Sequence, residues 1–68
     1  MDMLTFWREL PPANKRKLAT SLDTSVAYLS QIANGHRKAG FVLAKAIEDA
    51  TSGAVTREDL RPDVYLAA

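Results

Sequence analysis

The chain has 68 residues, of which 47% are hydrophobic and 25% are charged, with a formal net charge of +1 and no cysteine. These values are typical of one small globular domain, and they exclude a disordered chain, a disulfide scaffold and a thiolate metal site. The apolar runs are too short to span a bilayer and the start of the chain does not resemble a signal peptide, so we expect a cytoplasmic protein with no membrane segment.

Two helices are predicted in the N-terminal third of the chain. The first covers residues 2–10, with Asp2 as its N-cap. It stops before Pro11 because the residue that precedes a proline is pushed out of the helical region. The second begins at residue 13 or 14 and ends at Leu22. Pro12 suits its first turn, where an amide hydrogen has no partner within the helix.

Three further helical segments are predicted downstream, over residues 26–34, 41–51 and 57–60. Thr56 begins a capping sequence that favours the last of these as a single turn. No segment of the chain has the sequence pattern of a β-strand, so the predicted fold class is all-α, with four to five short helices. The fourth helix places its main apolar residues roughly on one side: Phe41, Leu43, Ala44, Ile47 and Ala50.

Residues 18–35, LATSLDTSVAYLSQIANG, have the pattern of a helix-turn-helix, with two apolar stripes at helical spacing. The small side chain of Ala19 allows two crossing helices to approach closely. Ser25 can cap the second helix with its hydroxyl. Gly35 can end that helix, because glycine enters the left-handed conformation without steric cost.

This stretch resembles the helix-turn-helix of the lambdoid phage repressor and Cro (Cro/CI) family, which it matches in the alanine of the first helix, the apolar positions and the closing Asn34-Gly35. The resemblance implies a lambda-repressor-like DNA-binding domain, which we place at residues 1–62 with its motif at 15–35. The turn position held by Asp23 is usually glycine in the family. Aspartate tolerates the left-handed region better than most residues, so we expect the turn to survive with slight strain.

A second resemblance lies near the end of the chain. The run SGAVTREDLRPD, residues 52–63, is similar to the tail of YdaS-like regulators, small prophage proteins often described as antitoxins. The order and spacing of the two resemblances together are more specific than either alone. They imply a prophage-encoded regulator, followed here by a short C-terminal tail at residues 63–68.

Positive charge is concentrated around the motif. Residues 11–40 carry a net charge of +4, whereas residues 1–10 carry −1 and residues 41–68 carry −2. Basic clusters on both sides of a helix-turn-helix favour binding to nucleic acid over a merely solvated basic face. RNA is the weaker candidate, because no aromatic residues are interleaved with the basic ones to stack on bases.

Base contacts are expected on the side of the recognition helix that faces away from its apolar stripe. Gln31 is the best single candidate, since a carboxamide can make a bidentate contact to adenine, and Ser30 can bond a base or a phosphate. Val26 and Ala27 can pack on thymine methyl groups. The family often has glutamine at both of these positions. The difference implies that this protein recognises a different operator from those family members, and that DNA shape and thymine methyl contacts contribute more to the recognition.

Contacts to the DNA backbone are expected at both ends of the motif, and they set the register of a protein on DNA rather than its sequence preference. Tyr28 can reach a phosphate through its hydroxyl or simply pack within the domain, and the sequence leaves both interpretations open. The expected set is Lys15, Arg16, Ser25, Tyr28, Asn34, His36, Arg37 and Lys38.

Enzyme activity is not expected, because the chain has no set of residues that could carry it. Its single histidine, His36, lies in a basic loop with no second histidine or cysteine at ligand spacing, so no metal site is expected. The sequence also contains no combination of a nucleophile, a base and a residue that orients the base. The acidic pairs at 48–49 and 58–59 are sequence neighbours and point in different directions on a helix. No cofactor and no small-molecule substrate are expected.

The expected function is sequence-specific binding of double-stranded DNA by a homodimer at a palindromic operator, with transcription repressed by occlusion. The predicted dimer interface is Val64, Tyr65 and Leu66, while Val55 and Leu60 can belong either to that interface or to the core. The alternative is an antitoxin-like protein that mainly binds a protein partner, such as a toxin or another repressor. That partner would contact the tail and exposed aromatic residues of the first helix, Phe6 and Trp7.

Overall fold

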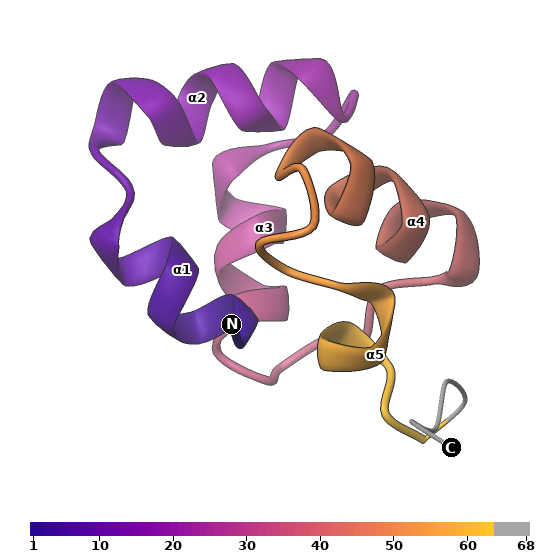
Figure 1. Cartoon of the computed structure of the whole chain (residues 1–68). Helices are drawn as coiled ribbons and strands as arrows, with labels where there is room; N and C mark the ends of the chain where they lie inside the picture. The colour runs from indigo at the N-terminus through magenta and orange to yellow at the C-terminus, as the bar shows by residue number, and fades with distance from the viewer. Residues whose placement is uncertain (64–68) are drawn as a thin grey trace.

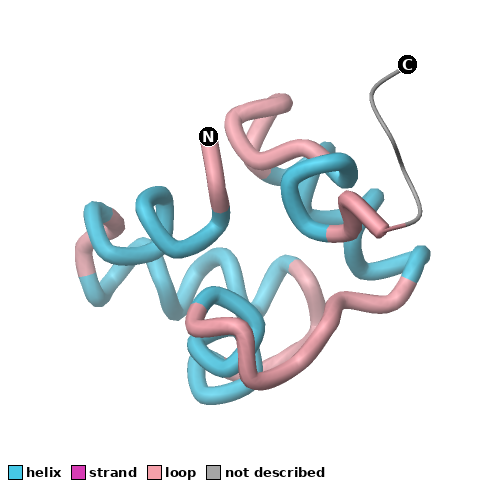
Figure 2. Tube along the Cα trace, turned by 90° about the horizontal axis from the view of Figure 1, so that it is seen from below, coloured by secondary structure: helices cyan, strands magenta, loops and turns pink. Residues whose placement is uncertain are grey.

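The computed structural model describes residues 1–63 and contains five helices within them (Figure 1). No strand occurs in this part of the chain, as the tube of Figure 2 shows, and the predicted all-α class is confirmed. Each helix begins and ends within two residues of its predicted boundary. The helices are α1 (Met3–Glu9), α2 (Pro12–Ser21), α3 (Val26–Ala33), α4 (Phe41–Ala50) and α5 (Arg57–Leu60).

The helices begin where the local sequence supplies partners for their first amide groups. Asp2 caps α1 by accepting a hydrogen bond from the backbone amide of Thr5 at 2.8 Å, and that amide and the Thr5 hydroxyl lower the pKa of Asp2. Ser25 caps α3 through the amide of Tyr28 at 3.0 Å. Proline occupies the start of α2, as expected. The caps confirm the predicted starts of α1 and α3, whereas α2 has no side-chain cap and begins at Pro12, ahead of its predicted start at residue 13 or 14.

α3 lies at the centre of the molecule, with α1 beside it and α2 across one of its ends (Figure 1). α4 and α5 pack against each other on the other side. Ala19 of α2 is buried, which fits the close approach of α2 to α3 expected for a helix-turn-helix. The buried core consists of Met3, Trp7, Ala19, Leu29, Ile32, Ala33, Ala39, Ala44, Ile47 and Val55.

Three helices end in the same backbone motif, in which the chain enters the left-handed region directly after the helix. After α3, Gly35 has a φ of 80°, and the amides of Gly35 and His36 donate to the carbonyl oxygens of Ile32 and Gln31. α2 and α4 end with the same pair of hydrogen bonds, but with non-glycine residues at the turn: Asp23 has a φ of 56° and Ser52 a φ of 54°. The expected left-handed turn at Asp23 is therefore confirmed.

The turn at Asp23 is expected to be more stable with glycine than with alanine. Both Asp23→Gly and Asp23→Ala remove the carboxylate, so their difference reports the left-handed backbone, which costs a residue with a Cβ about 1–2 kcal/mol, less the larger entropy that glycine loses on folding. Thermal unfolding followed by circular dichroism should place the midpoint of Asp23→Gly above that of Asp23→Ala. Equal midpoints would show that the turn carries no net conformational strain.

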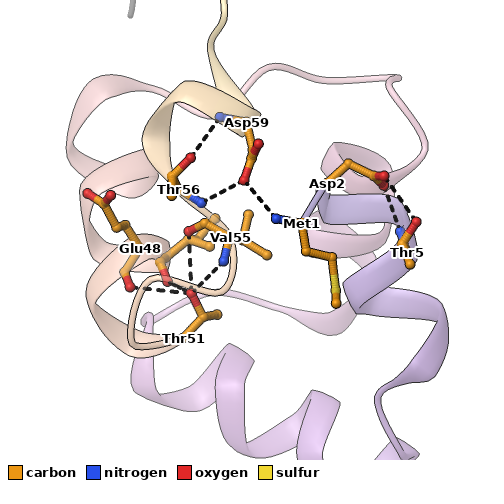
Figure 3. A network of polar contacts seen from close by, with 9 residues as sticks. Met1, Asp2, Thr5, Glu48, Thr51, Val55, Thr56 and Asp59 are labelled. Carbon is orange, nitrogen blue, oxygen red and sulfur yellow. Dashed lines mark hydrogen bonds and ion pairs between the residues drawn. The ribbon is translucent and has the colours of Figure 1, made fainter. Parts of the chain in front are cut away.

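Polar contacts join the end of α4 to the loop before α5, and α5 to the start of the chain (Figure 3). The Thr51 hydroxyl donates to the Ile47 carbonyl oxygen at 2.8 Å and accepts from the Val55 amide at 3.2 Å. Thr56 and Asp59 form the predicted capping box of α5, and Asp59 also pairs with the terminal ammonium of Met1 at 3.3 Å. Burial raises the pKa of Asp59, but the hydrogen bonds from Thr56 and the ammonium outweigh it, so the pKa is lowered overall.

Several packing predictions are corrected by the structure. Trp7 is only 4% exposed and belongs to the core, and Phe6 is half-buried against it, so neither is the exposed aromatic residue expected in the first helix. Phe41 is 57% exposed and Ala50 is also exposed, because the apolar residues of α4 extend around more of the helix than one side can bury.

Val55 is fully buried and Leu60 packs on the core. Of the two positions that the sequence allowed for these residues, the dimer interface or the core, the structure therefore shows the core.

Candidate nucleic-acid interface

α3 divides into a buried side and an exposed side, as an amphipathic helix does. Leu29, Ile32 and Ala33 are buried in the core, whereas Ala27 and Gln31 are exposed. The exposed side of α3 continues at both ends of the helix into its caps. It therefore presents the predicted residues Ser25, Ala27, Gln31 and Asn34, with Ser30 half-buried beside them.

Val26 and Tyr28 stand between the two sides of α3. Both are half-buried and pack against the core, so each keeps only part of its surface for another molecule. The two alternatives for Tyr28 are therefore compatible, since the ring packs while part of the side chain remains accessible. Val26 occupies the first position of α3, and the N-terminal residues of the second helix are the ones that contact base edges in DNA-bound helix-turn-helix proteins.

Ser30 and Asn34 are linked on the C-terminal half of α3. The Asn34 carboxamide nitrogen donates to the Ser30 carbonyl oxygen at 2.8 Å and to its hydroxyl oxygen at 3.4 Å. Because the carboxamide nitrogen is used in this way, its oxygen is the atom that Asn34 has left to offer as an acceptor.

Gln31 is not a free side chain, which the sequence did not reveal. The Arg37 Nε donates to the Gln31 Oε1 at 2.6 Å, and the Arg37 guanidinium lies 5.5 Å from the centre of the Tyr28 ring. The backbone explains this arrangement: the turn at Gly35 brings the amides of His36 and Arg37 onto the carbonyl oxygen of Gln31, at 2.9 and 3.3 Å. The loop after α3 thus folds back along the helix.

The basic residues differ in what they contact. The Lys15 Nζ lies 5.1 Å from the centre of the Trp7 ring, whereas Arg16 is exposed and forms no ion pair with any residue in the range 1–63. Lys38 pairs with Asp63 at 3.5 Å, both side chains being exposed. His36 is exposed in the same loop.

Three acidic side chains of the second half of the chain, Glu48, Asp49 and Asp63, are paired with basic residues of that half. Lys45 contacts Glu48 and Asp49, and Arg57 also contacts Glu48. The side-chain hydrogen bond from Arg61 lowers the pKa of Asp63 to about 2, so this carboxylate stays ionised beside Lys38. Of the ion pairs between described residues, only the one formed by Lys38 neutralises a cation of the predicted backbone-contacting set.

Three further observations concern the predicted interface, metal binding and membrane insertion. The predicted interface residues Val64, Tyr65 and Leu66 lie outside the residues that the structure describes. Residues 1–63 hold no group of three or more histidine or acidic side chains placed to bind a metal ion. Over the same range, no helix combines the length and apolar character that crossing a membrane requires.

Comparisons with known proteins found one family and one curated relative that match most of the chain. A family model described as "Bacterial toxin YdaS" matches residues 14–68, which include most of α2 and the whole of α3, α4 and α5. The chain is 44% identical over 63 residues to a protein of Escherichia coli (strain K12) described as "Prophage transcriptional regulatory protein". That alignment covers 93% of this chain and 96% of the relative.

Proposed function

The chain belongs to the YdaS family, and from this we propose that it regulates transcription in a prophage by binding double-stranded DNA through α3. One observation carries the proposal: the exposed side of α3 holds the guanidinium of Arg37, which forms no ion pair with any residue of the range 1–63. The B-DNA major groove admits one α-helix, and phosphates line its edges. The name of the Escherichia coli relative, a prophage transcriptional regulatory protein, supports the same function.

In the proposed complex, the exposed residues of α3 read base edges and the basic residues hold the phosphates. Base contacts come from Val26, Ala27, Ser30 and Gln31. Lys15 and Arg16 contact the backbone from the start of α2. The other backbone contacts come from the caps of α3, from Tyr28 and from the loop that follows the helix: Ser25, Tyr28, Asn34, His36, Arg37 and Lys38.

We further propose that the protein binds as a homodimer and represses by occlusion, in the manner of Cro and CI. One recognition helix reads only a few base pairs, and two-fold pairing doubles the site. The proposed interface is Val64, Tyr65 and Leu66, because these apolar residues follow Pro62 and carry more apolar area than a solvated tail needs. A protein that acts on an operator in this way works in the bacterial cytoplasm, at the nucleoid.

The alternative function, binding of a protein partner, is supported by the word toxin in the family description. The expected contact surfaces for a partner were the tail and the aromatic residues of the first helix. The second surface is not available, because Trp7 is buried and Phe6 packs on the core. We therefore favour DNA binding. The two functions respond differently to salt, since release of counterions makes DNA binding steeply salt-dependent.

Gln31→Ala is the variant that tests the proposed role of α3. Its side chain is exposed at the middle of the helix face, so we expect a loss of about 1–3 kcal/mol at one base-pair position and relaxed preference there. Fluorescence anisotropy with a selected duplex, its single-position variants and a scrambled duplex would measure this loss. An equal loss on the selected and scrambled duplexes would remove Gln31 from base recognition.

A further inference from the structure

Tyr28, Gln31 and Arg37 form a cluster on the exposed side of α3. The Arg37 guanidinium is held on two sides, by the hydrogen bond of its Nε to the Gln31 Oε1 at 2.6 Å and by the Tyr28 ring at 5.5 Å. Its backbone amide is also bound to the Gln31 carbonyl oxygen. Two side-chain contacts and one backbone contact thus hold an exposed arginine against the recognition helix.

The chemistry of arginine fixes the orientation of the Gln31 carboxamide. A guanidinium has only donors, so the carboxamide atom that faces it must be the oxygen, and the carboxamide nitrogen must point away. Arg37 keeps the four N–H groups of its two terminal nitrogens. Together, the pair Gln31–Arg37 presents mainly hydrogen-bond donors.

We propose that Arg37 is a positioning residue that sets Gln31 to read guanine rather than adenine. A glutamine that reads adenine accepts from the N6 amino group with its oxygen and donates to N7. In this protein the oxygen is held by a cation, and a base amino group directed at it would meet the guanidinium hydrogens. Guanine presents two acceptors, N7 and O6, in the major groove and suits a surface of donors. This inference rests on the proposed function of α3.

In the proposal the Arg37 Nε stays on Gln31, and only its terminal N–H groups are available to a phosphate. The alternative is that Arg37 leaves Gln31 in the complex and contacts a phosphate alone. The two possibilities predict different losses. A phosphate contact contributes equally to all sequences. A positioning role instead changes the preferred base at one position, which removal of a charge alone does not do.

The experiment compares base preference in Arg37→Ala and Lys38→Ala by selection from a randomised duplex library, with the wild type alongside. Both variants remove one positive charge from the same loop, but Lys38 contacts Asp63 and not Gln31. At the Gln31 position we expect the wild type to prefer guanine over adenine by about tenfold. Arg37→Ala should shift this preference to adenine, and Lys38→Ala should keep guanine.

A double variant separates positioning from direct reading by Arg37. In a Gln31→Ala background, Arg37→Ala should leave the remaining preference at that position unchanged. A further change there, or a wild type that prefers adenine, or a uniform loss with no change of base in Arg37→Ala, would overturn the proposal. Circular dichroism of each variant checks that it is folded. If the wild type itself enriched no sequence, the proposed function would fail instead.

Discussion

Trp7→Ala is expected to unfold the domain at 25 °C. Trp7 is 4% exposed, lies in the core and is contacted on one ring face by Lys15. Truncation of a buried tryptophan to alanine costs about 3–5 kcal/mol. A core in a domain of this size rarely supplies more than about that amount, so the loss is comparable to the whole free energy of unfolding. α3 would lose its support from α1 at the same time.

Urea denaturation followed by circular dichroism measures this effect, with Trp7→Phe as the matched control. Phenylalanine keeps an aromatic ring in the core, so that variant should remain folded with a lower midpoint. If Trp7→Ala unfolded at the wild-type midpoint, the side chain would not be part of the core. It would then be available to a protein partner, as the alternative function requires.

Replacement of Lys15 and Arg16 together is expected to weaken binding to every duplex alike. Each lost phosphate contact should lower the affinity on the order of tenfold at 0.1 M salt and reduce the salt slope by about 0.9. Arg16 is exposed, and Lys15 can turn from the Trp7 ring towards a phosphate, since a surface cation–π contact contributes only about 0.5–1 kcal/mol.

Affinity measured from low to high salt tests this prediction for both a selected and a scrambled duplex. Arg8→Ala with Lys45→Ala is the control, because it removes the same charge from exposed positions of α1 and α4. The control should keep the wild-type slope. If the two double variants had the same slope, the start of α2 would not lie at the phosphates.

The helices and their ends were predictable because their causes are local. A cap needs only the residue and an amide three positions on, as at Asp2, Ser25 and Thr56. The left-handed turn at Asp23 followed from the break between two apolar stripes and the resemblance to a family with glycine there. These features require no knowledge of how the helices pack.

Packing and the contacts of long side chains were not predictable in the same way. Two aromatic residues follow each other in α1, and only the position of α3 decides that Trp7 is buried while Phe6 is half-exposed. The bond between Arg37 and Gln31 depends on the return of the loop after Gly35. The one sequence signal for it was a closing Asn-Gly followed by basic residues.

Selection of duplexes by the wild-type protein from a randomised library tests the central claim most directly, that α3 reads DNA in a two-fold-symmetric pair. We expect a palindromic sequence whose half-site centres lie one helical turn, about 34–36 Å, apart, bound more tightly than a scrambled duplex at the same salt concentration. A recovered pool with no shared sequence, bound no better than random DNA, would contradict the account.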